Sequence, residues 1–257
     1  MKIKRVVTGA FSPTGTTGTV VTALSEGMGK PAAVCDLSPV DFAGAGFAQD
    51  DLLILGIPVF GGRVPVTAAK RIVKLKGHKT PAVAVAAYGN RAYEDALAEL
   101  QDLLEAQGFV VVAGVAAVTE HAIVREIAPG QPDEQSLARL RNFGEKIAAE
   151  LSAAAAPVRL ETMPGSRPYK AYKVLPVIPE VADACTACGL CAENCPVEAI
   201  PKEDPRVTDK DRCISCMRCI ARCPEDARAV PAAAYAVLKE KLQKACGDGV
   251  KMDELFI

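Results

Sequence analysis

The chain reads Cys185-Thr186-Ala187-Cys188-Gly189-Leu190-Cys191-Ala192-Glu193-Asn194-Cys195-Pro196, and further on it reads Cys213-Ile214-Ser215-Cys216-Met217-Arg218-Cys219-Ile220-Ala221-Arg222-Cys223-Pro224. Both runs follow the pattern Cys-x2-Cys-x2-Cys-x3-Cys-Pro, and together they contain eight of the ten cysteines. The offset that superposes the two runs also relates Asp211 to Asp183 and Ala227 to Ala199. The segment is therefore an internal duplication.

The cysteine spacing in each run suits an iron-sulfur cluster. A cubane cluster presents iron atoms a few ångströms apart, and a tight loop with a thiolate every third residue reaches three of them. The fourth ligand has to come from elsewhere in the chain. The two runs therefore predict two 4Fe-4S clusters.

Zinc and disulfide bonds are the alternatives, and both fit less well. Zinc sites usually have two Cys-x2-Cys pairs with a longer spacer and have no use for the third cysteine of each run. Disulfides require an oxidising compartment, and the N-terminal residues 1–7 lack the apolar segment of a signal peptide. The two remaining cysteines lie outside the runs, and Cys35, within an apolar stretch, is expected to be a buried core thiol.

Composition limits the class of protein. The chain has 257 residues, of which 50% are hydrophobic and 24% charged, and its formal net charge is −1. This balance gives no reason to expect nucleic acid or an anionic membrane surface as a partner. We found no apolar stretch of about 18 residues that would predict a membrane span. A soluble, cytoplasmic protein is expected.

The N-terminal part of the chain, before the proline-rich stretch, alternates between apolar, β-branched runs and segments with helical spacing. Apolar runs that are continuous rather than alternating indicate strands buried on both faces, as in a parallel sheet covered by helices. The predicted fold class is therefore α/β, with a doubly wound, parallel, five-stranded sheet. The expected strands are Ile3–Val7, Ala32–Leu37, Leu52–Ile57, Ala82–Ala87 and Phe109–Val118, and the expected helices are Thr16–Met28, Val66–Lys74, Arg91–Gln107 and Asp133–Ala155.

Composition also suggests domain boundaries. Residues 1–156 form the predicted α/β domain, and the proline-rich residues 157–180 form a linker. Residues 181–231 form the cluster domain. Residues 232–257 contain a last helix, Ala232 to Ala245, which is expected to pack back on one of the two domains, followed by a tail.

The loop after the first predicted strand reads Ser12-Pro13-Thr14-Gly15-Thr16-Thr17 and leads into a helix. Hydroxyl groups and free amides at a helix N-terminus suit a phosphate. The chain lacks both Gly-x4-Gly-Lys-Ser/Thr and Gly-x-Gly-x2-Gly, so neither triphosphate hydrolysis nor a dinucleotide is indicated. Serine- and threonine-rich turns also act as simple helix caps, and the loop alone leaves that alternative open.

Two further loops are expected at the same edge of the sheet. They contain glycines that let the backbone approach a flat ring and aromatic side chains that stack against one. The residues predicted to bind a cofactor in the three loops are Ser12, Thr14, Gly15, Thr16, Thr17, Pro58, Val59, Phe60, Gly61, Gly62, Tyr88, Gly89, Asn90 and Tyr93.

The first loop resembles the flavodoxin signature Ser/Thr-x-Thr-Gly-x-Thr, and the cysteine runs resemble those of two-cluster ferredoxins. The whole chain is similar to flavodoxin-ferredoxin fusion proteins, iron-sulfur flavoproteins found mainly in anaerobic microbes. The resemblance implies FMN in the first domain and a small, bacterial-ferredoxin-like α+β second domain. The chain departs from free flavodoxins in having no Trp, and Thr16 stands where many of them have Asn.

In two-cluster ferredoxins the last cysteine of each run binds the cluster of the other run. The resemblance therefore implies crossed ligand sets. The first cluster would be held by Cys185, Cys188, Cys191 and Cys223, and the second by Cys213, Cys216, Cys219 and Cys195.

These assignments predict an electron relay in which two 4Fe-4S clusters and FMN pass electrons between a low-potential donor and an unidentified acceptor. The expected partner is a redox protein acting as donor or acceptor, and a homodimer is compatible with the sequence. Two alternatives remain. One is an FMN-dependent reductase of a quinone, nitro compound or similar molecule, and the other is a ferredoxin whose flavodoxin-like domain has no cofactor and only docks. In the reductase, the substrate pocket would involve Arg63, Arg91, Glu120, His121 and Arg125, with His121 as the candidate proton donor.

Overall fold

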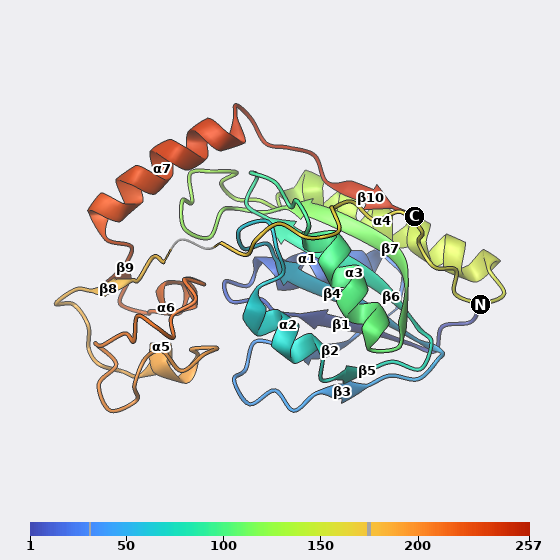
Figure 1. The fold of residues 1–257 in the computed structure, drawn as a ribbon, viewed down its shortest axis with the longest axis horizontal. Coiled ribbons are helices and arrows are strands. Elements are labelled where there is room, and N and C mark those ends of the chain that lie inside the picture. The colour runs from blue at the N-terminus through green and yellow to red at the C-terminus, as the bar shows by residue number, and fades with distance from the viewer. Residues whose placement is uncertain (31, 174–175) are drawn as a thin grey trace.

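The computed structural model of the protein describes residues 1–30, 32–173 and 176–257. Figure 1 shows a large α/β part and a smaller part that contains β8, α5, α6 and β9. The elements in chain order are β1 Arg5–Ala10, α1 Thr16–Gly27, β2 Ala32–Asp36, β3 Ala45–Gly46, β4 Asp51–Pro58, α2 Val66–Ile72, β5 Leu75–Lys76, β6 Thr80–Tyr88, α3 Ala96–Ala106, β7 Phe109–Val118, α4 Glu134–Ala153, β8 Glu180–Val181, α5 Leu190–Glu193, α6 Arg218–Ala221, β9 Arg228–Ala229, α7 Ala232–Cys246 and β10 Glu254–Phe256.

The central sheet has the strand order β10-β7-β6-β4-β1-β2. Five of its strands, β1, β2, β4, β6 and β7, pair in parallel. Their order is that of the flavodoxin-like doubly wound fold, so the predicted fold class is confirmed. The tail adds a sixth strand that the sequence did not predict, because β10 pairs antiparallel with β7.

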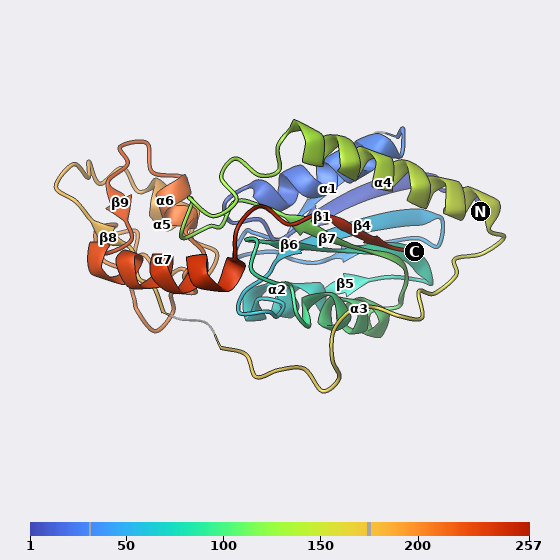
Figure 2. The same ribbon diagram turned by 90° about the horizontal axis from the view of Figure 1, so that it is seen from above.

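Helices cover both faces of the sheet. Figure 2 shows α1 and α4 on one side and α2 and α3 on the other. Neighbouring residues of β4 alternate between the two layers: Leu52 and Ile54 pack with α1 and α4, whereas Leu53 and Leu55 pack with α2 and α3. Each buried leucine or isoleucine contributes about 1.5–3 kcal/mol to folding. The continuous apolar runs therefore stabilise both layers.

Three predicted features differ from the structure. The edge strand β2 is not buried on both faces, since Val34 is 80% exposed and Cys35 is only partly buried. The expectation that Cys35 is a core thiol is thus only partly met. Helix α3 begins at Ala96 rather than Arg91, because residues 91–95 form a loop beside the cavity described below.

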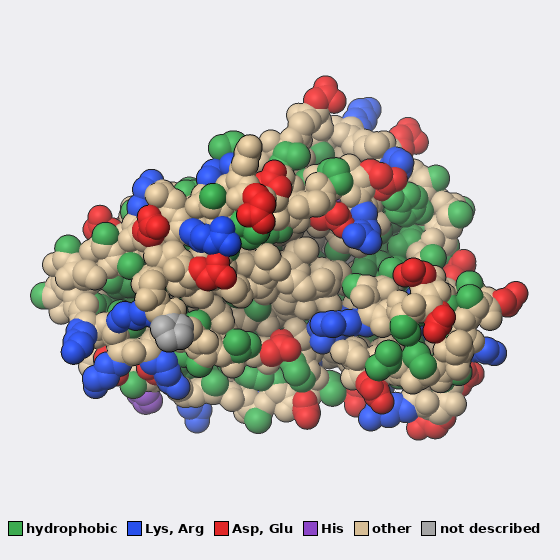
Figure 3. Space-filling model, turned by 180° about the vertical axis from the view of Figure 1, so that it is seen from behind, with side chains coloured by type: hydrophobic (Ala, Val, Ile, Leu, Met, Phe, Trp, Pro, Cys, Tyr) green, Lys and Arg blue, Asp and Glu red, His purple; other side chains and the backbone are tan. Residues whose placement is uncertain are grey.

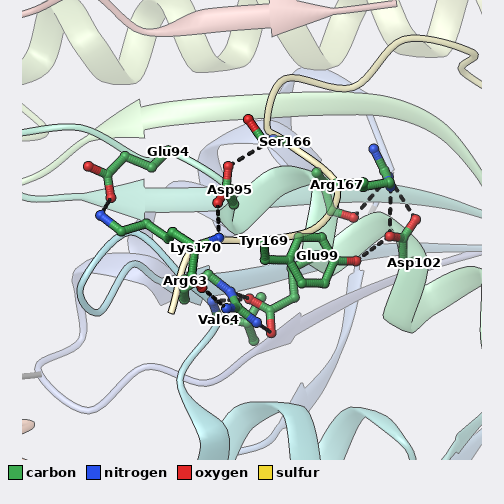
Figure 4. A network of polar contacts seen from close by, with 11 residues as sticks. Arg63, Val64, Glu94, Asp95, Glu99, Asp102, Ser166, Arg167, Tyr169 and Lys170 are labelled. Carbon is green, nitrogen blue, oxygen red and sulfur yellow. Dashed lines mark hydrogen bonds and ion pairs between the residues drawn. The ribbon is translucent and has the colours of Figure 1, made fainter. Parts of the chain in front are cut away.

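The predicted linker is fastened to the α/β domain along much of its length, although its residues 174–175 lie outside the described residues. The Asp95 carboxylate accepts hydrogen bonds from the backbone N–H groups of Ser166 (2.8 Å) and Lys170 (2.7 Å). Arg167 pairs with Asp102 of α3 at 2.7 Å. Figure 4 shows this network running along α3. The segment therefore acts as a strap rather than a free tether.

The duplication recurs in the conformation of the cluster domain. Ala187 and Ser215, which occupy corresponding positions of the two runs, both have φ 55°. The thiol sulfur of Cys195 accepts a hydrogen bond from the N–H of Ala199 (3.2 Å), and that of Cys223 accepts one from Ala227 (3.3 Å). The two runs are thus structural as well as sequence repeats.

The last helix and the tail join the two parts. In α7, Leu238 and Cys246 belong to a small apolar cluster that contains Val124 of the α/β domain and Met217 of the cluster domain. The helix therefore packs on both domains, where the sequence predicted one. The tail is held by the buried Asp253, whose carboxylate accepts the N–H of Val118 (2.9 Å).

On the face drawn in Figure 3, acidic and basic side chains are interspersed over most of the surface, and several basic side chains gather at the lower left. Within the parts of the chain that the structure describes, no helix has the length and apolar character needed to cross a membrane.

Candidate functional site

A cavity of about 230 Å³ lies at the carboxyl ends of β1, β4, β6 and β7, and we call it the loop cavity. Parallel sheets of this order bind their ligands at this edge. Its lining includes Pro13, Thr14, Thr16, Thr17, Pro58, Val59, Phe60, Gly61, Gly62, Tyr88, Gly89, Arg91, Ala92, Thr119, Glu120, His121, Ala122, Ile123, Lys173, Ser215, Cys216, Leu238 and Leu242. The three predicted loops therefore meet around one space, together with residues of the cluster domain and α7.

The first loop brings the N-terminus of α1 to this cavity. Gly15 is the residue before α1, has φ 99° and makes no side-chain cap. Thr14 and Thr16 line the cavity with their hydroxyl oxygens 3.5 Å apart. Ser12 caps part of the first turn, because its hydroxyl accepts the N–H of Gly18 (2.9 Å). The remaining N–H groups at a helix N-terminus suit an anion, so the loop combines a helix cap with a place for a phosphate.

The other two loops approach the cavity closely because they contain glycine. Gly62 has φ 82°, and a side chain there would collide with Glu94. A side chain at Gly89 would collide with the His121 ring. Tyr88 is buried and packs edge-to-face on Tyr93, with ring centroids 5.4 Å apart. A residue larger than glycine at position 62 or 89 would therefore disrupt the close packing of these loops around the cavity.

Four predicted cofactor residues do not line the cavity. Ser12 supports the first loop, because its hydroxyl accepts the N–H of Gly18 (2.9 Å), and Gly15 turns the chain there. Asn90 binds the tail instead, donating to the Gly249 carbonyl (2.9 Å). The Tyr93 hydroxyl contacts Glu254 of β10 at 3.2 Å.

Three of the five predicted substrate-pocket residues line the cavity, namely Arg91, Glu120 and His121. Arg63 does not, because it pairs with Glu99 at 2.6 Å and stacks over the Tyr169 ring at 4.6 Å. Arg125 extends outward, with 76% of its side chain exposed, and pairs with Glu120.

His121 is held as a neutral ring. Its Nδ1 accepts hydrogen bonds from the N–H groups of Ile123 (3.2 Å) and Val124 (3.1 Å). Burial lowers the pKa of His121 to about 4, and the charge of Arg91 acts in the same direction. The ring proton therefore lies on Nε2, which makes His121 a hydrogen-bond donor rather than the acid suggested by the sequence.

This lowered pKa predicts a loss of stability in acid. The unfolded chain takes up a proton near pH 6.5, but folded His121 does not until about pH 4. The contribution of His121 to the free energy of unfolding is therefore fully present above pH 6.5 and is lost as the pH falls. At about pH 5 the free energy of unfolding is lower by about 2 kcal/mol. We expect the denaturation midpoint of the wild type to fall more steeply between about pH 7.5 and pH 5 than that of His121→Gln. Parallel curves would contradict this assignment.

The eight repeat cysteines gather around two small cavities. The first cysteine cavity is lined by Cys185, Cys188, Cys191 and Cys223. The second is lined by Cys195, Cys213, Cys216 and Cys219. Each cavity thus takes three cysteines from one run and the fourth from the other, which is the grouping implied by the crossed ligand sets.

Burial raises the pKa of three thiols of the second cysteine cavity, to about 12 for Cys216 and about 11 for Cys219, and above its usual value for Cys213. Such thiols stay protonated at neutral pH unless a metal replaces the proton. Among the described residues, no three His, Cys, Asp or Glu side chains converge to hold a single metal ion.

Cys216 lines both the second cysteine cavity and the loop cavity. Its neighbour Ser215 lines both as well, and the Ser215 hydroxyl accepts the N–H of Val177 (2.8 Å). The cysteine site nearer the α/β domain is therefore adjacent to the predicted flavin site. Cys188, in the first cysteine cavity, is exposed.

Two buried arginines hold this junction together. Arg71 of α2 donates to the Ser38 carbonyl (2.8 Å) and to the Pro196 carbonyl (2.6 Å), directly after Cys195. Arg218 of α6 donates in the other direction, to the carbonyl of Ser12 (3.2 Å). Sequence reasoning missed both residues, because their partners across the junction lie far away along the chain.

Loss of the Arg71 contacts should loosen the junction. Arg71→Met leaves buried carbonyls without donors, and we expect the free energy of unfolding to fall by about 2–4 kcal/mol. The matched control is Lys70→Met, which changes an exposed residue of the same helix. Denaturant unfolding measures both variants, and equal midpoints would show that Arg71 does not hold the domains together.

Comparison with known proteins gives one family match, in which residues 184–227 match the 4Fe-4S dicluster domain. The prediction of a 4Fe-4S domain is therefore confirmed. A search of curated proteins found no match to this chain.

Among solved structures, an archaeal flavodoxin is similar at 13% identity and TM-score 0.38, covering 58% of this chain and 99% of its own. Flavodoxin 2 from Bacillus cereus is similar at 14% identity and TM-score 0.41, covering 57% and 99%. Rubredoxin oxygen:oxidoreductase from Desulfovibrio gigas is similar at 17% identity and TM-score 0.41, covering 59% and 37%. The flavodoxin-like fold assignment rests on the strand order described above.

Proposed function

We propose that this chain, which combines a flavodoxin-like fold with a 4Fe-4S dicluster domain, relays electrons between two 4Fe-4S clusters and FMN. The observation that carries the proposal is the position of Cys216 and Ser215, which line the second cysteine cavity and the loop cavity at once. Electron transfer slows steeply with distance, so adjacent sites favour exchange within one chain.

The proposed cluster ligands are Cys185, Cys188, Cys191 and Cys223 for one cluster and Cys195, Cys213, Cys216 and Cys219 for the other. Their support is the grouping of the thiols in two cavities. Thiolates are the usual ligands of 4Fe-4S clusters. The backbone hydrogen bonds to the sulfurs of Cys195 and Cys223 would tune the reduction potentials of the clusters.

The proposed FMN site uses the N-terminus of α1 and the Thr14, Thr16 and Thr17 hydroxyls for the phosphate. The two glycine loops and Tyr88 would hold the ring. FMN would supply a centre that exchanges one or two electrons, whereas each cluster exchanges one. The fit rests on the N-terminus of α1, where the N-cap residue Gly15 makes no side-chain hydrogen bond, and on Thr14, Thr16 and Thr17, which line the loop cavity there.

The arrangement also suggests an order of sites. The first cysteine cavity contains the exposed Cys188 and is the natural contact for a redox protein. The second cysteine cavity lies beside the loop cavity. Covalent fusion keeps the domains at high effective concentration, and the contacts of Arg71 and Arg218 fix their separation.

A second candidate is a reductase of a small molecule. The observation that favours it is the lining of the loop cavity by Arg91, Glu120 and His121. There the Nε2–H of His121 would donate a hydrogen bond to a bound acceptor, and Arg91 would attract a negatively charged one.

Anaerobic purification followed by iron, sulfide and flavin analysis tests the proposal. We expect about eight iron, eight sulfide and one FMN per chain. Iron without FMN would instead support a ferredoxin with a docking domain. Turnover of quinones or nitro compounds at rates comparable to electron supply would favour the reductase.

A further inference from the structure

Two buried arginines contain nitrogen atoms that the protein leaves without partners. Among the described residues, the buried side-chain nitrogens lacking a hydrogen bond are Nε of Arg218 and Nε of Arg228. The residues are only 9% and 3% exposed. A buried donor without a partner is costly and rare in native proteins, so these atoms point to an acceptor that the polypeptide does not itself supply.

Each arginine lines one cysteine cavity. Arg228 lines the first, beside Cys185, Cys188, Cys191 and Cys223. Arg218 lines the second. The Nη atoms of both are engaged: Arg228 donates to the Thr208 hydroxyl at 3.0 Å, and Arg218 to the Ser12 carbonyl at 3.2 Å. These contacts fix the positions of the guanidinium groups, and the Nε–H groups are left without an acceptor.

The first copy of the repeat has no arginine at either of these positions. When the two runs are superposed, Arg218 corresponds to Leu190 and Arg228 to Ile200. Leu190 lines the first cysteine cavity and Ile200 the second. Each cavity is thus lined by one of these apolar residues from the first copy and by one arginine from the second. Each cavity therefore has one buried cation in its lining.

We propose that Arg228 and Arg218 donate their Nε–H groups to sulfur atoms of the cluster in the cavity that each lines, and thereby raise its reduction potential. The inference rests on the proposed function. Reduction adds one electron to a cluster and breaks no bond, and a fixed, buried cation and hydrogen-bond donor beside the cluster stabilises the added negative charge. The arginines are tuning residues and need not be ligands.

The test is a potentiometric titration of the anaerobically purified protein, followed by EPR of the clusters. Arg228→Ile installs the residue found at the corresponding position of the first copy. We expect the equilibrium constant for reduction of one cluster to fall at least tenfold, which is about 59 mV for one electron. Arg218→Leu should lower the midpoint of the other cluster. The control Arg222→Gln removes an exposed arginine from the same run and should leave both midpoints unchanged.

Unchanged midpoints in Arg228→Ile, with full iron and sulfide content, would overturn the proposal. If that variant loses its cluster, Arg228→Lys decides, because lysine retains the charge but lacks the Nε donor. A midpoint below that of the wild type then supports the hydrogen bond, and an unchanged midpoint refutes it. A wild-type chain without clusters would instead refute the proposed function, so the two failures are distinguishable.

Discussion

Cys223→Ser should destroy the cluster of the first run, although Cys223 belongs to the second. It lines the cavity of Cys185, Cys188 and Cys191. We expect iron to fall from about eight to about four per chain, because a 4Fe-4S cluster that loses a thiolate is readily lost. The free energy of unfolding should fall as well, since cluster binding and folding are coupled.

A set of four variants identifies the lost cluster. With crossed ligands, Cys223→Ser should leave the same EPR spectrum as Cys188→Ser, and Cys195→Ser should match Cys216→Ser. If Cys223→Ser matched Cys216→Ser instead, each run would hold its own cluster and the crossed assignment would be wrong. Iron analysis of the same samples shows whether one cluster remains.

Thr14→Ala should weaken FMN binding by about tenfold to a hundredfold. The Thr14 hydroxyl lines the loop cavity beside the α1 N-terminus, and a hydrogen bond to a charged group contributes about 1.5–3 kcal/mol. The fold should lose less than about 0.5 kcal/mol, because Thr14 is a half-buried loop residue outside the apolar clusters. Fluorescence titration of flavin-free protein measures the affinity.

Riboflavin makes this test specific for the phosphate. It lacks the phosphate group, so its affinity should be nearly the same in the wild type and in Thr14→Ala. Thr19→Ala, which removes an exposed hydroxyl from the following helix α1, is the matched control and should bind FMN normally. Equal losses of FMN and riboflavin affinity would place Thr14 near the ring or show a general distortion of the site.

Short sequence patterns predicted the structural features that are determined by residues close together in the sequence. The cysteine runs predicted the 4Fe-4S domain, and the continuous apolar runs predicted the five parallel strands. The tail strand β10 was missed because Glu254–Phe256 is very short and depends on Asp253 and the β7 edge. Asn90 was predicted to bind the cofactor because its loop resembles a flavin loop. Its hydrogen bond to the carbonyl of Gly249 in the tail could not be predicted, because the two residues lie far apart in the sequence.

The buried arginines show a different limit. Arg71 and Arg218 find their partners across the domain junction, and no local pattern reports such contacts. A signal for Arg218 and Arg228 was nevertheless present, because the repeat has apolar residues at the corresponding positions Leu190 and Ile200. A charged residue that replaces an apolar one in a duplicated motif marks a position where the two copies have different surroundings.

The central claim, that electrons pass between the clusters and the flavin within one chain, is tested most directly by pulse reduction of the anaerobic holoprotein. Absorbance would follow the clusters and the flavin after a sub-stoichiometric pulse of reductant, over a range of protein concentrations. We predict redistribution between the centres with a first-order rate constant that does not depend on protein concentration. A rate proportional to protein concentration, or no redistribution at all, would contradict the relay.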